Sequence, residues 1–277
     1  MRRVNSLTEK ICGVPLGMSG SIVLLRAHGQ AGKLFGVKLE GKTVLVTGAA
    51  KRLGRAIAMA LARRGANIVV HYNTSYDAAR NTVAAIKAAG VDALAVRADQ
   101  TKQREVRVAV RKAVRRFGRI DVLINSAAVF RRTPFRQLTE NDWDFHLDAN
   151  LKGPFLFAWE VSRYMRRGHI INFADWAARH AYRDYLPYLV SKTGVIGLTE
   201  SLAKELSPQI QVNAIAPGPV LLPSDMTKRE REAIRKATLL RRLGTPQDVV
   251  NAVLYLLEGG DFVTGHTLVV DGGRLLA

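Results

Sequence analysis

The sequence TGAAKRLG, residues 47–54, joins a β-branched run that begins at Thr43 to an Ala- and Arg-rich stretch over Arg55–Arg64. Gly48 permits a tight turn, and Gly54 permits close approach between the start of a helix and a pyrophosphate group. Two glycines also occur in ordinary turns, but here the strand, turn and helix follow one another as dinucleotide binding requires. The segment therefore predicts a phosphate-binding turn after the first strand of a parallel sheet.

From Gly41 onward, short β-branched runs alternate with long helical stretches, which is typical of βαβ units. We expect seven strands, at Thr43–Thr47, Ile68–His71, Ala93–Arg97, Val122–Asn125, His169–Phe173, Gln211–Ile215 and Thr267–Val270. Seven strands joined by six crossovers predict a single doubly wound α/β domain of Rossmann type, with a seven-stranded parallel sheet. Right-handed crossovers place ligands at the carboxyl ends of the strands, so functional residues should directly follow them.

The composition fits one domain over residues 37–277. Apolar residues make up 48% and aromatic residues 7% of the 277-residue chain, as expected when helices cover both faces of a parallel sheet. Residues 1–36 lack periodicity, and we expect them to be a poorly ordered extension or the product of a mis-assigned start. The remaining chain of about 240 residues suffices for one large domain.

Several classes of function are disfavoured by the sequence. The single cysteine, Cys12, forms no intrachain disulfide, and no Cys/His cluster has metal-site spacing. No apolar run approaches the roughly 20 residues that cross a bilayer. We expect a cytoplasmic protein with no metal and no membrane contact. The formal net charge of +19 permits nucleic-acid binding, but the cations lie mostly at helical spacing without interleaved aromatics. We therefore expect no nucleic-acid partner, and a field that attracts anionic small molecules.

The segment Thr47–Gly54 resembles the T-G-x-x-x-G-x-G fingerprint of the short-chain dehydrogenase/reductase family, and the resemblance extends over residues 41–273. Arg52 stands where the middle glycine is usual, and TGAAKRLG in this form is similar to the pteridine reductase branch. After the second strand, where an NAD site would place an acidic residue, the chain reads HYNTS, residues 71–75. Arg52, His71 and the Ser75 hydroxyl would favour the 2′-phosphate of NADPH as cofactor.

The resemblance also implies further contacts to the cofactor. Asp99 would bind the adenine amino group, and small residues after the fourth strand would let the backbone approach the cofactor. The residues implied in cofactor binding, besides those named above, are Thr47, Gly48, Leu53, Gly54, Asn73, Gln100, Asn125, Ser126, Ala127, Pro217 and Gly218. Residues 219–244 occupy the place of the family's mobile substrate loop.

Tyr188 and Lys192 lie four residues apart, on one face of a predicted helix. The resemblance identifies them as the catalytic pair. Tyr188 would donate the proton, with its pKa lowered by Lys192 and by the nicotinamide charge, while Lys192 would also bind the nicotinamide ribose. Asn150 matches a family asparagine whose carbonyl region positions a water molecule that leads to Lys192.

Asp175 stands thirteen residues before Tyr188, where the family normally has a serine that binds a substrate carbonyl. An aspartate at this place resembles the pteridine reductases. It could pair with an amino-heterocycle or, if burial raises its pKa, supply a proton to a ring nitrogen. Phe130 matches a phenylalanine that stacks on the pterin ring, although ordinary packing would explain it equally. Tyr185 occupies a matching place in the same wall.

The leading hypothesis is an NADPH-dependent reductase of a dihydropterin or dihydrofolate-like substrate. A 3-oxoacyl carrier-protein reductase, or another ketone or sugar reductase of the same fold, is the alternative enzyme. A dinucleotide sensor or a nucleic-acid binder is the alternative from another class, and the intact pair of Tyr188 and Lys192 argues against it. The resemblance suggests a homotetramer built on the helices that carry Asn150 and Tyr188.

Overall fold

The computed structural model describes residues 38–222 and 226–277, so the predicted N-terminal extension and Cys12 lie outside the described residues. The described chain contains a seven-stranded parallel sheet in the order β3-β2-β1-β4-β5-β6-β7. The strands are β1 (Thr43–Val46), β2 (Asn67–Tyr72), β3 (Ala93–Arg97), β4 (Val122–Asn125), β5 (Gly168–Phe173), β6 (Ile210–Pro217) and β7 (Thr267–Val270). The predicted Rossmann-type sheet is confirmed, and each strand lies within two residues of its predicted bounds.

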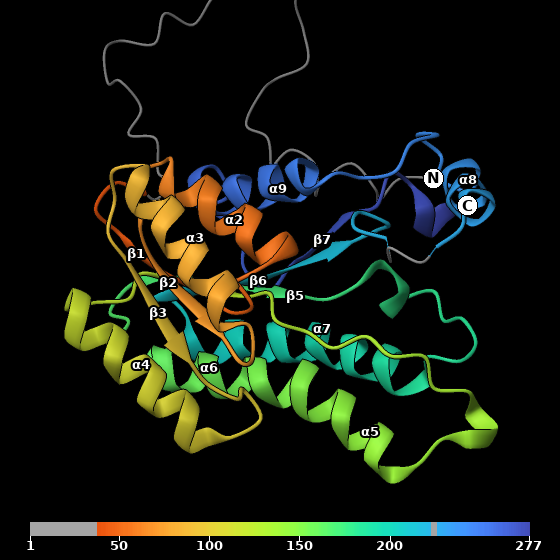
Figure 1. Cartoon of the computed structure of the whole chain (residues 1–277), viewed down its shortest axis with the longest axis horizontal. Helices are drawn as coiled ribbons and strands as arrows, with labels where there is room; N and C mark the ends of the chain where they lie inside the picture. The colour runs from red at the N-terminus through yellow and green to blue at the C-terminus, as the bar shows by residue number, and fades with distance from the viewer. Residues whose placement is uncertain (1–37, 223–225) are drawn as a thin grey trace, which may run out of the picture. The chain divides into compact units, whose positions relative to one another are not determined.

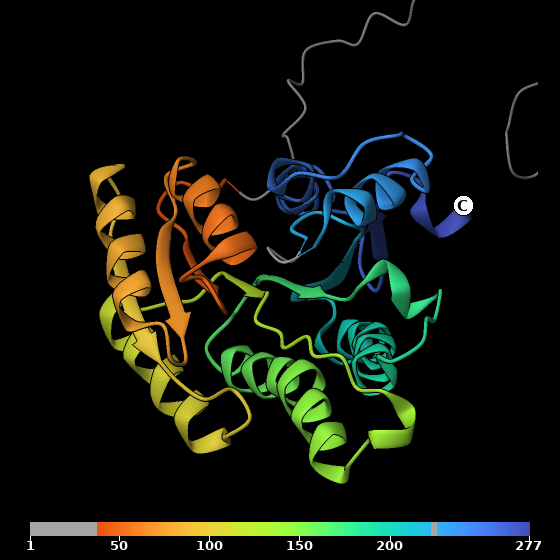
Figure 2. The same cartoon turned by 45° about the vertical axis from the view of Figure 1, so that its right-hand side comes forward.

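Helices cover both faces of this sheet (Figures 1 and 2). One face carries α2 (Arg52–Ala62), α3 (Tyr76–Ala88) and α9 (Pro246–Glu258), and the other carries α4 (Gln103–Phe117), α6 (Gly153–Ser162) and α7 (Leu186–Leu206). Each face has its own large apolar core. Val44, Leu45 and Val46 of β1 are all fully buried because neither face of the sheet meets solvent. The covered faces explain why the strands are continuously apolar instead of alternating.

The chain order creates a crevice at the middle of the sheet. β1 pairs with β2 on one side and with β4 on the other, so the crossovers that leave β1 and β4 run in opposite directions. In doubly wound sheets such a switch point opens a crevice at the carboxyl ends of the strands, where ligands bind. The turns after β1, β2, β3 and β4 all reach this edge.

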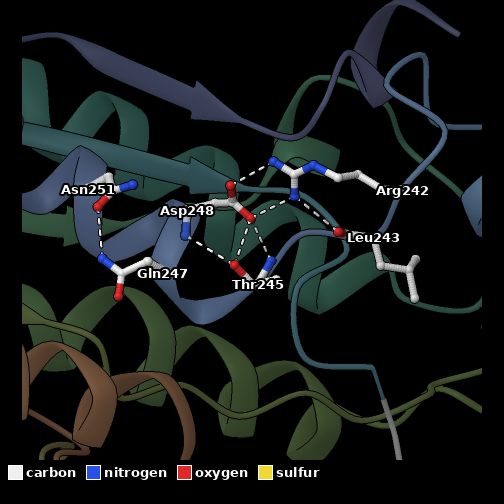
Figure 3. Close-up of polar contacts among 6 residues, drawn as sticks. All are labelled: Arg242, Leu243, Thr245, Gln247, Asp248 and Asn251. Carbon is white, nitrogen blue, oxygen red and sulfur yellow. Dashed lines mark hydrogen bonds and ion pairs between the residues drawn. The ribbon is translucent and has the colours of Figure 1, made fainter.

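Two segments next to this edge complete the site. The helix α5 (Glu140–Leu147) continues through a π-helical turn, Asp148–Lys152, into α6. The predicted substrate loop, residues 219–244, contains α8 (Lys228–Lys236). This loop ends at a network that holds the start of α9 (Figure 3): Thr245 and Asp248 form a capping box, and Arg242 donates two hydrogen bonds, of 2.8 and 2.7 Å, to the Asp248 carboxylate. One end of the loop is therefore fixed to the body of the domain.

Candidate active site

The turn after β1 requires glycine at two positions. Gly48 has a φ of +66°, and a Cβ added there would lie 2.9 Å from the Cα of Ala127. A Cβ added at Gly54 would lie 2.5 Å from the carbonyl oxygen of Gly48. Thr47 holds the neighbouring strand exit in place, since its Oγ1 accepts a 3.0 Å hydrogen bond from the Ala127 amide. The glycines thus let the start of α2 close tightly over the turn, as a phosphate-binding turn requires.

A cavity of about 730 Å³ lies at this edge of the sheet. Its volume falls in the range of cofactor pockets. It brings together most of the predicted cofactor residues, from the turns after β1, β2, β3 and β4. Those that line it are Gly48, Arg52, Leu53, Gly54, His71, Asn73, Ser75, Asp99, Gln100, Ser126 and Ala127. A cavity that crosses four βα turns, with the narrow glycine turn at one side, fits an extended dinucleotide.

Four of the predicted cofactor residues do not line this cavity. Thr47 and Asn125 are buried, and the Asn125 amide donates to Asn172 at 2.9 Å and to the Pro154 carbonyl at 3.2 Å. Pro217 ends β6, and Gly218 lines a neighbouring cavity of about 510 Å³. Direct side-chain contact between Asn125 and a cofactor in the cavity is therefore not supported, because its amide group is turned into the protein.

The predicted phosphate-binding role of the His71 side chain is contradicted by its environment. The ring is buried: Nε2 lies 3.0 Å from the Ala98 carbonyl oxygen, and Nδ1 accepts a 3.3 Å hydrogen bond from the Gly48 amide. Burial lowers the pKa of His71 to about 4, so the ring is neutral at pH 7. His71 holds the Gly48 turn against the end of β3 and offers no positive charge to a phosphate.

Arg52 adopts a conformation that normally favours glycine. Its φ is +51°, in the left-handed region, which accounts for the glycine that the family fingerprint usually has there. Its guanidinium donates a 2.6 Å hydrogen bond to the Leu221 carbonyl in the substrate loop, and the residue lines the cavity. Nearby, Ser75 makes no side-chain cap bond to α3. Both residues line the cavity.

The predicted catalytic residues meet where β5 ends and α7 begins. The hydroxyl of Tyr188 donates a 2.5 Å hydrogen bond to Oδ2 of Asp175, and Oδ1 of Asp175 accepts from the Ala177 amide at 2.9 Å. Lys192 is buried, and its Nζ donates a 2.6 Å hydrogen bond to the Phe173 carbonyl. The structure therefore brings Tyr188, Asp175 and Lys192 together, although they do not line the 730 Å³ cavity.

The electrostatics of this cluster differ from the expected pattern in one respect. Burial, followed by the charge and hydrogen bond of Asp175, raises the pKa of Tyr188 well above its usual value. The predicted lowering of the Tyr188 pKa by Lys192 is thus wrong for the chain's own groups, because burial and the Asp175 carboxylate, 2.5 Å from the phenol oxygen, both disfavour the phenolate. Burial also raises the pKa of Asp175, and it lowers the pKa of Lys192 to about 8. Burial thus favours the neutral form of all three groups.

Asn150 connects the cofactor edge to the catalytic helix. It lies in the π-helical turn and is buried. Its Oδ1 accepts from the Val129 amide at 2.8 Å, and its Nδ2 donates to the Val129 carbonyl at 3.0 Å and to Ser191 at 3.1 Å. The side chain thus clamps the segment after β4 to α7, one residue before Lys192.

Phe130 and Tyr185 form an aromatic wall beside the phenol. Their rings stack with centroids 4.7 Å apart and planes inclined by 12°, and the Tyr188 ring meets Phe130 edge-on at 4.8 Å. Phe130 remains 52% exposed, so its ring is not a core side chain. The exposure favours the substrate-wall interpretation over ordinary packing.

Three neighbours of the catalytic cluster were not predicted from the sequence. Ser191 bonds Asn150, and its own hydroxyl donates to the Tyr188 carbonyl at 2.6 Å. Trp176 follows Asp175 and lies beneath the guanidinium of Arg274, 5.2 Å from the ring centroid. His146 is fully buried near Tyr188. Its spacing of four residues before Asn150, which places both on one helix face, is the only indication the sequence gives.

Within the part of the chain that the structure describes, no group of three His, Cys, Asp or Glu residues could hold a metal ion. In the same residues, no helix is both long enough and apolar enough to cross a membrane.

Comparison with known proteins places the chain in a family. The family described as "Enoyl-(Acyl carrier protein) reductase" matches residues 48–274. The chain is 37% identical over 244 residues to the 3-oxoacyl-[acyl-carrier-protein] reductase FabG of Staphylococcus epidermidis, covering 85% of this chain and 99% of that protein. It is 38% identical over 250 residues to the short-chain reductase protein NovJ of Streptomyces niveus, covering 85% of this chain and 94% of NovJ.

Solved structures agree. A putative short-chain alcohol dehydrogenase from Sinorhizobium meliloti superposes with a TM-score of 0.82 at 29% identity, covering 87% of this chain and 100% of that one. A blue fluorescent protein from a metagenomic library, solved in complex with NADPH, gives 0.81 at 32% identity, covering 86% and 99%. With the glycine turn, the cavity and the Tyr188–Lys192 pair, these similarities establish that the chain belongs to the short-chain dehydrogenase/reductase family of oxidoreductases.

Proposed function

We propose that the chain is an NADPH-dependent reductase that adds hydride and a proton across a polar double bond, with Tyr188 as the proton donor. The observation that carries the proposal is the cluster of Tyr188, Asp175 and Lys192 beside the turns that line the dinucleotide-sized cavity. When bound, NADPH supplies the hydride. Tyr188 holds the proton at its hydroxyl, and Phe130 and Tyr185 form an aromatic surface against which a substrate can lie.

Three observations support NADPH over NADH. Residues 71–75, at the end of β2, include no carboxylate that would bind the ribose 2′-hydroxyl of NADH. Arg52 and Ser75 line the cavity and supply a cation and a hydroxyl for a 2′-phosphate. The blue fluorescent protein, 32% identical to this chain, was solved with NADPH.

The first candidate substrate is a 3-oxoacyl thioester. The similarity to 3-oxoacyl-[acyl-carrier-protein] reductases extends over 85% of the chain and favours this candidate over the pteridine hypothesis. Asp175 stands where the family has a serine that donates to the substrate carbonyl. Burial raises the Asp175 pKa, and a protonated carboxyl group donates a hydrogen bond as the serine would.

A dihydropterin is the second candidate, because Asp175 and Phe130 specifically favour it. An ionised carboxylate in van der Waals reach of a carbonyl would repel the negative charge that develops on its oxygen, whereas it would attract the amino group of a heterocycle. The half-exposed Phe130 ring offers a flat face to such a heterocycle. No relative named above is described as a pteridine reductase, so this candidate rests on the site alone.

A substrate panel tests both candidates. NADPH oxidation is followed with an acetoacetyl thioester, dihydrobiopterin, dihydrofolate and small ketones, using the parent chain and Tyr188→Phe. Turnover of the thioester alone would support the first candidate, and turnover of the pterins alone the second. If no substrate is reduced faster by the parent than by Tyr188→Phe, the proposed role of Tyr188 fails.

We also propose that the chain assembles as a homotetramer through α5, α6 and α7. Phe155 and Trp159 of α6 are 41% and 38% exposed and stack on one another, and Leu186 and Val190 of α7 are 41% and 37% exposed. Apolar side chains gathered on helices in this way are typical of subunit interfaces. Light scattering of the eluting protein tests this, and a mass near the 30.5 kDa of one chain would contradict it.

A further inference from the structure

His146, which no catalytic or binding role described above includes, is fully buried on α5 with both ring nitrogens engaged. Nδ1 lies 2.8 Å from the Asp142 carbonyl oxygen, and Nε2 lies 3.3 Å from the Arg131 amide nitrogen. A carbonyl oxygen only accepts hydrogen bonds, so Nδ1 carries the hydrogen atom. Nε2 therefore keeps its lone pair and accepts from Arg131. The two contacts fix the tautomer and the orientation of the ring.

These contacts act on the segment that carries Phe130. Asn150, one helical turn after His146, holds the amide and the carbonyl of Val129 on one side of Phe130. His146 holds the Arg131 amide on the other side. The Arg131 guanidinium also lies 4.0 Å from the centroid of the Phe145 ring. The backbone on both sides of Phe130 is thus fastened to α5 and its π-helical continuation.

The ring of Phe130 depends on this fastening because no core surrounds it. It is 52% exposed, and its ring contacts are with Tyr185, stacked at 4.7 Å, and Tyr188, edge-on at 4.8 Å. An exposed ring whose backbone shifts loses a stacked geometry easily, since few neighbours oppose the movement. The hydrogen bond from the Arg131 amide to the buried His146 ring is therefore a means of setting where the Phe130 ring lies relative to the phenol of Tyr188.

We propose that His146 is a positioning residue that sets the Phe130 ring against Tyr188 and thereby tunes substrate affinity. The predicted effect on substrate affinity rests on the proposed function, whereas the predicted effect on the position of the Phe130 ring does not. His146 does not touch the reacting atoms; it acts through the Arg131 amide. Loss of the Nε2 acceptor should loosen the chain at Arg131. Asn150 would still hold Val129, which lines the cofactor cavity.

The structural consequence is tested without any substrate. The chain is labelled with 4-fluorophenylalanine, and Phe130→Leu identifies the Phe130 resonance among the nine phenylalanines in the ¹⁹F spectrum. His146→Leu should shift or broaden that resonance, and His146→Gln, whose amide oxygen can take the place of Nε2, should restore it. His146→Asn, too short to reach Arg131, serves if the leucine variant does not fold and should behave like it. His169→Leu, which removes another buried histidine at the far end of β5, is the matched control.

The kinetic consequence is tested with whichever substrate the panel identifies. His146→Leu should raise KM by up to about tenfold, the net value of one hydrogen bond, with a smaller change in kcat and an unchanged Kd for NADPH. In a Phe130→Ala background the same substitution should change KM little, because the ring it positions is gone. An unaltered Phe130 resonance in both His146→Leu and His146→Asn overturns the inference, as does an equal KM effect in both backgrounds. A panel with no substrate would remove the proposed function but leave the ¹⁹F result decisive for His146.

Discussion

The phenol oxygen of Tyr188 lies 2.5 Å from Oδ2 of Asp175, to which it donates a hydrogen bond. The two residues are thirteen positions apart: Asp175 follows β5, and Tyr188 lies in the first turn of α7. A carboxyl group in this place couples its own titration to that of the Tyr188 phenol, the proposed proton donor. The serine usual in the family does not titrate and would not do so. The phenol hydrogen of Tyr188 is therefore bonded to a carboxyl oxygen of the chain itself.

Tyr188→Phe should reduce kcat by about 10²-fold or more, because general-acid catalysis typically contributes that much. The substitution removes the hydroxyl and its bond to Asp175 but keeps the ring that contacts Phe130. The Kd for NADPH, measured by fluorescence titration, should stay close to that of the parent. A variant with normal turnover would exclude Tyr188 as the proton donor.

Asp175→Ser restores the arrangement usual in the family and separates the two substrate candidates. If the natural substrate is a dihydropterin, its reduction should fall by about tenfold or more, because a charge-assisted contact or a proton source is lost. Reduction of 3-oxoacyl thioesters or simple ketones should be unchanged or should rise. Initial rates with both substrate types measure this, and an unchanged pterin rate would exclude a pterin-binding role for Asp175.

The same carboxyl predicts the pH dependence of 3-oxoacyl reduction. Burial raises the Asp175 pKa, so its protonated, donating form persists to a higher pH than that of an ordinary aspartate. As pH rises through this pKa the donor is lost, and kcat/KM should fall. Asp175→Asn keeps a donor at every pH, so its profile should lose this descending limb. Parallel profiles for parent and variant would show that the limb belongs to another group.

Arg52→Gly should narrow the preference for NADPH over NADH. Glycine suits the +51° φ of this position, so the change removes the guanidinium without adding strain. Loss of one charge-assisted contact to the 2′-phosphate predicts about a tenfold weaker Kd for NADPH and little change for NADH. Arg55→Ala, on the exposed side of α2, is the control and should leave both Kd values unchanged. If the parent itself prefers NADH, the interpretation of Arg52 is wrong.

Gly54→Ala should abolish measurable cofactor binding or folding, because the new Cβ would lie 2.5 Å from the Gly48 carbonyl oxygen and force the turn apart. Gly197→Ala is the matched control: it is exposed on α7, and a Cβ there would meet nothing within 4 Å. That change should stabilise the chain by up to about 1 kcal/mol through helix propensity. Thermal unfolding with and without NADPH measures both, and Gly54→Ala with parent-like binding would contradict the close-packed turn.

The sequence alone was sufficient to predict the sheet, because continuous apolar strands and intervening helical stretches are local patterns. It also located the glycine turn, since a positive φ at Gly48 and a close approach at Gly54 depend on the residue type itself. The spacing of Tyr188 and Lys192 placed both on one face of α7. Each of these features depends on neighbours within a few residues, where the chain's geometry leaves little choice.

Only the tertiary structure determined which polar side chains form hydrogen bonds with other groups of the chain. The sequence predicted His71 as a cation for a phosphate, but its Nε2 lies 3.0 Å from the carbonyl oxygen of Ala98, directly after β3, and burial keeps the ring neutral. Burial and the Asp175 carboxylate, to which Tyr188 donates, raise the pKa of the phenol. The Nζ of Lys192 donates to the Phe173 carbonyl. The contact of His146 with the Arg131 amide arises only because α5 packs against the segment after β4. Such partners lie thirteen or more residues apart, and only the packing of sheet, helices and loops sets their distances and their burial.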